Sequence, residues 1–308
     1  MSVKLRKKYA PYYCGYPSKG PEYFELRWDV IDCVLRCEFC WSPASRPEST
    51  NEPIVQKNAT QIYDETVRNI KYPSKSFIRF TGGEPTLYWE ELIQVFGLLA
   101  NHERMVNVPI LIQTNGILIG RGDVDLSELN SEPITKLQFL FELSLKGTNA
   151  DEFEILTTKP KEFYEHQLSA YEKFKTAQKN NPNLSLVTVL GIYHSSIKSK
   201  RSKYAFVYPS DGTLMFDKHK PWHHKFEKIW NESERKWVEP LRMSPKGMWE
   251  NIVKRCGENG AKILKYFPNG VCTNPESVFP AKPKGYEYAC GLVSNQYWRA
   301  LYTTQKQL

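Results

Sequence analysis

The first two-thirds of the chain alternates between short apolar runs and longer segments in which apolar residues recur every three or four positions. The short runs predict β-strands and the periodic segments predict helices. The predicted strands are Phe24–Ile31, Ser76–Phe80, Pro109–Thr114, Leu137–Leu145 and Leu184–Tyr193, with a further candidate at Tyr204–Tyr208. The predicted helices cover Gln61–Ile70, Tyr88–Ala100 and Glu162–Ala177. Strands that alternate with helices in this way indicate an α/β fold built around a parallel sheet.

The number of predicted strands is too small for a closed eight-stranded barrel, so a partial barrel or an open sheet is expected. After Pro209–Gly212 the pattern changes, and Trp222, Phe226, Trp230 and Trp237 fall near one face of a predicted helix. Residues from about 258 onward are rich in Gly, Pro and Asn, which is typical of loops. We therefore expect an N-terminal extension over 1–22, a barrel over 23–210, and a mainly helical and loop C-terminal region over 211–308.

Composition and charge narrow the class of protein only slightly. The net charge of +8 permits an anionic partner, but it does not by itself indicate nucleic acid. An apolar content of 41% supports a large buried core and excludes a disordered chain. No run approaches the roughly 18 apolar residues of a membrane-spanning helix. The basic start, Lys4–Lys8, is expected to be a solvated tail and leads into no apolar signal core, so a cytoplasmic protein without membrane association is expected.

Three of the seven cysteines lie within eight residues of one another. Cys33, Cys37 and Cys40 have the spacing C-x3-C-x2-C, and the first histidine of the chain is the distant His102. A structural zinc site normally has four protein ligands, so it fits this segment poorly. Thiolates are the usual ligands of iron–sulfur clusters. Three of them on a four-iron cluster leave one iron open, as expected of a catalytic metal centre.

Polar and glycine-rich turns follow three of the predicted strands. The first turn is Gly82-Gly83-Glu84-Pro85 and the second is Thr114-Asn115-Gly116. The third segment, 144–147, contains Ser144 and Lys146. Ligands of α/β folds bind at the carboxyl ends of parallel strands, where these turns should meet. Two glycines let the backbone approach a ligand closely, and Glu84 can accept a hydrogen bond from an ammonium group.

These segments resemble the radical SAM superfamily over Phe24 to Tyr193. Cys33, Cys37 and Cys40 match its C-x3-C-x-aromatic-C signature, with Phe39 as the aromatic residue. The segment Gly82–Pro85 matches its GGEP motif, whose backbone and glutamate meet the amino group of S-adenosylmethionine (SAM). The resemblance implies a partial (β/α)6 barrel and a 4Fe-4S cluster.

Three looser matches follow along the chain. Thr114 and Asn115 are similar to the segment after the family's third strand. Ser144 and Lys146 are similar to the fourth-strand end that contacts the ribose or carboxylate of SAM in members resembling activating enzymes. Gly191 falls where the fifth strand lines the adenine. The resemblance therefore implies that all these residues contact the cofactor.

The resemblance also implies a definite chemistry. The open iron is chelated by the amino and carboxylate groups of SAM, and one electron cleaves the sulfonium C–S bond. Methionine leaves, and the 5′-deoxyadenosyl radical takes a hydrogen atom from the substrate. An electron donor of the flavodoxin or ferredoxin kind is implied as a partner. The family signature does not indicate the substrate.

The remaining cysteines provide four further potential ligands, at Cys14, Cys256, Cys272 and Cys290. Cys14 and Cys290 precede glycines and Cys272 follows Gly270-Val271, so loop positions are expected. No two of them have the C-x2-C spacing, and scattered buried thiols are common. A second iron–sulfur cluster or a zinc site is one interpretation, and ordinary buried cysteines are the other.

Several functions are compatible with these features. A peptide, a protein or a small molecule is the favoured substrate class, and a tRNA-modifying enzyme is the alternative. The non-enzyme alternative is an iron–sulfur electron carrier. The Gly-Gly-Glu-Pro turn argues against a carrier, because a carrier has no need of a SAM-binding site.

Overall fold

The structure is a computed structural model of the 308-residue chain, and it describes residues 2–7, 10–16, 23–37, 40, 53–147, 149–193, 204–207, 229–231 and 236–238. The chain divides into two compact units. The first comprises Met1–Arg36, Cys40–Ser144 and Glu165–Val187. The second comprises Cys37–Phe39, Leu145–Tyr164 and Thr188–Leu308. Most predicted cofactor residues belong to the first unit.

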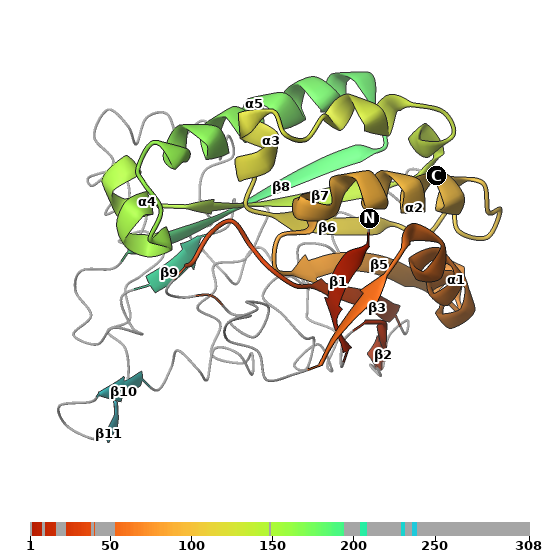
Figure 1. Ribbon diagram of the computed structural model, residues 1–308, viewed down its shortest axis with the longest axis horizontal. Coiled ribbons are helices and arrows are strands. Elements are labelled where there is room, and N and C mark those ends of the chain that lie inside the picture. Colours follow the sequence, from red (N-terminus) through yellow and green to blue (C-terminus); the bar gives the residue numbers. More distant parts are fainter. Residues whose placement is uncertain are drawn as a thin grey trace, which may run out of the picture. The chain divides into compact units, whose positions relative to one another are not determined.

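A mostly parallel sheet forms the centre of the first unit (Figure 1). Four neighbouring strands run parallel, with Phe24 opposite Ser76, Ile78 opposite Ile110, and Ile110 opposite Phe139. They are β3 (Tyr23–Val30), β5 (Ser76–Gly82), β6 (Ile110–Thr114) and β7 (Phe139–Lys146). The next strand in the sheet, beside β7, is β8 (Leu184–Tyr193). Each lies where an apolar run predicts a strand, so those five predictions are confirmed.

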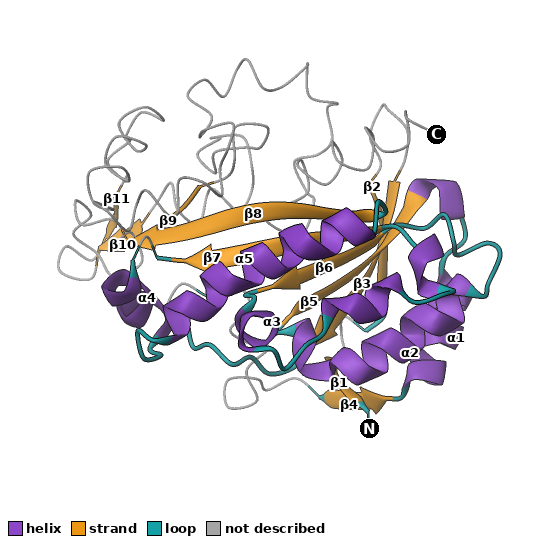
Figure 2. Cartoon of the chain, turned by 90° about the horizontal axis from the view of Figure 1, so that it is seen from above, coloured by secondary structure: helices purple, strands orange, loops and turns teal. Residues whose placement is uncertain are grey.

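Helices of the first unit cover one face of this sheet, as Figures 1 and 2 show. Alternate side chains of a strand point to that face. Phe80 packs edge-on against Phe96 at 6.0 Å between ring centroids, and Phe141 lies 4.8 Å from Phe174. The helices are α1 (Ala59–Asn69), α2 (Trp89–Ala100), α3 (Ile117–Arg121) and α5 (Phe163–Asn180). Short 3-10 helices span Pro73–Lys75, Pro85–Tyr88, Leu126–Asn130 and Ile134–Lys136.

Three antiparallel strands extend the sheet beside β3. They are β1 (Val3–Arg6), β2 (Tyr12–Tyr16) and β4 (Ile54–Lys57). β1 pairs with both β3 and β4, so the expectation of a solvated tail over Lys4–Lys8 is wrong for its first three residues. Val3 and Leu5 are completely buried while Lys4 between them is exposed, and this alternation is that of an ordinary half-buried strand.

The second unit contains α4 (Ala150–Thr157) and three further strands, β9 (Tyr204–Val207), β10 (Ile229–Asn231) and β11 (Lys236–Val238). β9 lies where a strand is predicted, but it pairs antiparallel with the end of β8 and adds no sixth parallel unit.

The helix predicted for Trp222, Phe226, Trp230 and Trp237 is wrong at Trp230 and Trp237, and the other two residues lie outside the described residues. Trp230 and Trp237 lie opposite each other in the antiparallel pair formed by β10 and β11. Aromatic residues favour strands, and two residues on facing strands of a hairpin can share the spacing that a helix would also produce.

The fold class is confirmed as α/β, with a mostly parallel sheet of the partial-barrel kind. Within the described residues, no helix has the length and apolar character required to cross a membrane.

Candidate functional site

The segment 31–40, which we call the cysteine loop, begins where β3 ends. Polar side chains of the loop form hydrogen bonds with its own backbone. Asp32 has a left-handed backbone (φ 79°), and its side chain accepts a hydrogen bond from the Cys33 N–H at 2.8 Å. Arg36 forms an ion pair with Asp32 at 3.5 Å and donates hydrogen bonds to the carbonyl oxygens of Cys33 and Leu35. These local bonds fix the backbone around Cys33.

None of the three cysteines of the loop forms a disulfide among the described residues. Cys33 and Cys40 are partly exposed, whereas Cys37 is buried. Phe39, the aromatic residue of the signature, lies outside the described residues. Among the residues that the structure places, no three His, Cys, Asp or Glu side chains form a ligand group for a single metal ion.

The glycine turn after β5 lies directly against the start of the cysteine loop. Gly83 donates its N–H to the Val30 carbonyl at 2.9 Å, and Glu84 donates its N–H to the Asp32 carbonyl at 2.7 Å. A β-carbon on Gly83 would overlap the carbonyl oxygen of Asp32. Gly82 has φ 92°, a conformation that residues with side chains rarely adopt. Both glycines are therefore required by the backbone path of this turn.

Glu84 is buried, with 1% of its surface exposed, and its carboxylate accepts four hydrogen bonds. Oε1 accepts from the Thr86 N–H at 3.2 Å, the Thr86 hydroxyl at 2.6 Å and the Thr114 hydroxyl at 2.7 Å. Oε2 accepts from the Asn115 N–H at 2.8 Å. Burial raises the pKa of Glu84, and the four donors oppose that rise by stabilising the carboxylate. Glu84 thus ties the turn after β5 to the end of β6.

The end of β6 turns tightly into α3. Gly116 donates its N–H to the Thr114 hydroxyl at 3.0 Å, and Ile117 donates its N–H to Oδ1 of Asn115 at 3.0 Å. The Asn115 side-chain amide points toward the cysteine loop, where Nδ2 lies 3.5 Å from Sγ of Cys33. Three segments predicted to meet, namely the cysteine loop, the glycine turn and the β6 end, are therefore joined by direct hydrogen bonds.

The other predicted cofactor residues lie farther along the sheet. Ser144 and Lys146 occupy the end of β7, where Ser144 is partly exposed and Lys146 is 8% exposed. Gly191 lies in β8, opposite Phe206 of β9. Cys14 lies within β2, opposite Glu25, so the loop position expected for it is wrong. Cys256, Cys272 and Cys290 lie outside the residues that the structure describes.

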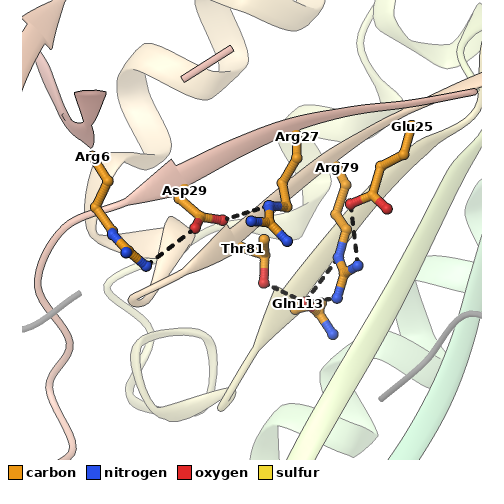
Figure 3. Close-up of polar contacts among 7 residues, drawn as sticks. All are labelled: Arg6, Glu25, Arg27, Asp29, Arg79, Thr81 and Gln113. Carbon is orange, nitrogen blue, oxygen red and sulfur yellow. Dashed lines mark hydrogen bonds and ion pairs between the residues drawn. The ribbon is translucent and has the colours of Figure 1, made fainter. Parts of the chain in front are cut away.

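The sheet face opposite the helices carries buried charges that the sequence analysis missed; we call it the polar face (Figure 3). Arg79 forms an ion pair with Glu25 at 3.2 Å and donates to Gln113 at 2.7 Å. Gln113 also accepts from Thr81 and donates to Glu142 at 3.0 Å. These partners come from neighbouring strands, so the network runs across β3, β5, β6 and β7.

A second group on the polar face surrounds Asp29. Its carboxylate lies 3.1 Å from Nε of Arg27 and 3.6 Å from Nη1 of Arg6. Neither Asp29 oxygen has a hydrogen-bond donor within the described structure, and the side chain is completely buried. Burial raises the pKa of Asp29, although Arg27 and Arg6 act in the opposite direction. The alternation of Glu25, Arg27 and Asp29 with apolar residues along β3 was the available sequence signal.

The sequence model of the radical SAM superfamily matches residues 13–198. The chain belongs to the radical SAM superfamily. Enzymes of this family use a 4Fe-4S cluster and SAM, and they carry out SAM-dependent radical chemistry that requires a reductant and a substrate.

No curated protein matches the chain. One solved structure that it resembles is native anSMEcpe with bound AdoMet and Cp18Cys peptide, at 19% sequence identity and a TM-score of 0.35. That likeness covers 51% of this chain and 39% of the chain in that structure.

Proposed function

We propose that Cys33, Cys37 and Cys40 bind the 4Fe-4S cluster of this radical SAM enzyme. The donor set fits the group, because three cysteines outside any disulfide in one short loop can each bind a different iron and leave the fourth iron open. The side chains of Asp32 and Arg36 hold the loop through bonds to its backbone and to each other.

The glycine turn is the proposed binding site for the amino group of SAM. The hydrogen bond from Gly83 to the end of β3 at Val30, and that from Glu84 to the Asp32 carbonyl of the cysteine loop, bring this turn next to Cys33. Oε1 of Glu84 already accepts three hydrogen bonds while Oε2 accepts one, so Oε2 is the oxygen with capacity for a further donor. The other residues proposed to contact SAM are Phe39, Gly82, Pro85, Thr114, Asn115, Ser144, Lys146 and Gly191.

The proposed reaction is reductive cleavage of SAM followed by abstraction of hydrogen from a substrate. When bound, the cluster and SAM supply the one-electron cleavage that yields methionine and the 5′-deoxyadenosyl radical. The protein chain orients both groups and keeps water from the radical. The observation that carries this proposal is the direct hydrogen bonding of the glycine turn to the cysteine loop.

The polar face supports a substrate with charged or hydrogen-bonding groups. The interior of an ordinary parallel barrel is filled mainly by Val, Ile and Leu. Here Arg79, Glu25 and Asp29 occupy such positions, although buried ion pairs are often no more stable than apolar residues of the same volume. We propose a peptide, a protein or a polar small molecule as the substrate class, ahead of tRNA.

Electron paramagnetic resonance (EPR) of the reduced protein, with and without SAM, tests this proposal against an electron carrier. A cluster with an open iron should change its EPR signal when SAM is added, whereas a carrier with four protein ligands should not respond. Cys33→Ala, Cys37→Ala and Cys40→Ala should each remove the signal.

Val34→Ala is the matched control, because it alters a side chain of the same loop and leaves the three thiols in place. Its signal and its response to SAM should equal those of the wild type. A wild-type cluster whose signal is unchanged by SAM would contradict the proposal.

A further inference from the structure

The sulfur of Cys33 lies beside two nitrogen donors of different origin. The Leu35 backbone N–H is 3.4 Å away and belongs to the cysteine loop itself. The Asn115 side-chain nitrogen is 3.5 Å away and comes from the end of β6, 82 positions later in the chain. Distances of this size are normal for hydrogen bonds that sulfur accepts. The Leu35 N–H is near the sulfur because both belong to the same loop. The Asn115 amide is near it only because the sheet places the end of β6 beside that loop.

The orientation of the Asn115 amide is determined by its other bonds. Its Oδ1 accepts the Ile117 N–H at 3.0 Å, and a backbone N–H requires an acceptor. The NH2 group therefore faces the sulfur of Cys33 and can donate to it. Its backbone N–H is bound by Oε2 of Glu84 at 2.8 Å, and only 6% of the residue is exposed. Asn115 is thus fixed at its backbone and at both ends of its amide.

We infer that Asn115 raises the reduction potential of the cluster by donating a hydrogen bond to the ligand sulfur of Cys33. This inference rests on the proposed function, which makes Cys33 a cluster ligand. Reduction adds negative charge to the cluster and its sulfurs, so a hydrogen bond to sulfur stabilises the reduced form more than the oxidised form. Hydrogen bonds to cluster sulfurs are among the known determinants of such potentials. Glu84 then acts as a positioning residue, because it holds the backbone of Asn115.

The reduction potential, measured by an EPR-monitored redox titration without SAM, tests the inference. Asn115→Ala removes the donor, and Asn115→Asp keeps the acceptor for Ile117 while replacing the donor with an oxygen. Both variants should have a more negative potential. The ratio of reduced to oxidised cluster at a fixed solution potential should fall roughly tenfold, which is about 59 mV for a one-electron couple.

Asn101→Asp is the matched control for the charge change. Asn101 is an exposed residue at the end of α2 whose amide donates to the Gly97 carbonyl at 3.0 Å, so it undergoes the same substitution away from the cysteine loop. Its potential should equal that of the wild type. An unchanged potential in Asn115→Ala with a normal iron content would overturn the inference.

A measurement on the wild-type protein covers the case in which the Asn115 variants fail to assemble a cluster. With 15N-labelled asparagine and no SAM, the reduced cluster should show a nitrogen hyperfine coupling in electron–nuclear double resonance spectra. No coupling from asparagine would overturn the inference. Absence of any 4Fe-4S signal from the wild type would instead contradict the proposed function, so the two failures are distinguishable.

Discussion

Glu84 has a structural role, and its proposed cofactor-binding role belongs to the same side chain. Its carboxylate accepts from Thr86, Thr114 and the Asn115 backbone in a buried site. Each carboxylate oxygen accepts one backbone N–H, from Thr86 or from Asn115. A glutamine at this position has only one oxygen, so its NH2 group would face one of these N–H donors, which cannot accept a hydrogen bond. A buried donor left without a partner costs about 1–3 kcal/mol. The carboxylate charge is therefore needed before any ligand binds.

Glu84→Gln should lower both the thermal stability of the cluster-free protein and the affinity for SAM. Loss of a charge-assisted hydrogen bond of about 1.5–3 kcal/mol corresponds to roughly 10- to 150-fold weaker SAM binding. Calorimetric melting and equilibrium binding measure the two effects. Glu128→Gln is the control. Glu128 is exposed and lies away from the site, and its carboxylate accepts a hydrogen bond of 2.6 Å from the Trp89 side chain. Unchanged stability and affinity in Glu84→Gln would contradict both roles.

Tyr88 should make part of the stability depend on alkaline pH. Burial, together with the nearby Asp32 carboxylate, raises the pKa of Tyr88 from 10.0 to about 12, and its hydroxyl donates to the Ile31 carbonyl at 2.9 Å. A raised pKa means that the folded state keeps the proton longer than the unfolded state. The contribution to stability is therefore complete below pH 10.0 and is lost as the pH rises to about 12.

Tyr88→Phe is the variant that isolates this contribution. It removes one hydrogen bond, so it should lower the free energy of unfolding by about 1 kcal/mol at neutral pH. The difference from the wild type should shrink between about pH 10 and pH 12 in denaturant titrations. A difference that stays constant over this range would show that Tyr88 does not titrate with folding.

At the residue scale, the sequence predicts which segments meet but not how their side chains pair. The spacing of Cys33, the glycine turn and Asn115 is visible in the chain, because each follows a strand. The burial of Glu84 by Thr114 and the network around Arg79 depend on the register between strands far apart in sequence. A one-residue change of register would send those side chains to the other face of the sheet.

At the element scale, the turn after β5 depends on close backbone contact with the cysteine loop. Gly83→Ala would drive a β-carbon into the Asp32 carbonyl, so the loop must move. We expect a loss of about 1–3 kcal/mol of stability, as for other overpacked sites, and reduced iron incorporation during reconstitution. Thermal melting and iron analysis measure these effects.

Gly97→Ala provides the matched control for the same substitution. Gly97 lies within α2, and a β-carbon there meets nothing within 4 Å. Replacement of a mid-helix glycine by alanine should stabilise the protein by about 0.5–1 kcal/mol and leave the iron content unchanged. Equal effects of the two substitutions would show that the contact with Asp32 does not matter.

The elements that pattern reasoning found are those with long, continuous apolar signals. β6 and β7 were predicted closely because they are near-continuous apolar runs buried on a parallel sheet. β1 and β4 have only four residues each, and their pairing joins segments about fifty positions apart. Such short runs give weak periodicity, so the sequence does not predict the edge strands or the hairpin of β10 and β11, and only the structure shows them.

At the scale of the whole molecule, a second metal site remains a proposal. Cys14 lies in β2 before the parallel strands, and Cys256, Cys272 and Cys290 follow them in the sequence. Metal binding by both ends of the chain would add folding free energy to segments rich in Gly and Pro. The proposal predicts that a second cluster assembles independently of the first.

A triple alanine variant of Cys33, Cys37 and Cys40 tests this proposal. After anaerobic reconstitution it should keep about half of the wild-type iron and sulfide if the second site is another four-iron cluster. Adding Cys272→Ala should remove that remainder. Zinc in place of iron would indicate a structural site, and a folded triple variant without metal would leave the four residues as ordinary thiols.

Formation of 5′-deoxyadenosine is the measurement that tests the central claim most directly. The anaerobically reconstituted protein, reduced with dithionite, should convert SAM to equal amounts of 5′-deoxyadenosine and methionine, even slowly without substrate. Cys37→Ala should form neither product, because its cluster loses a protein ligand. Undiminished product from Cys37→Ala, or none from a wild-type protein with a full reduced cluster, would contradict the account.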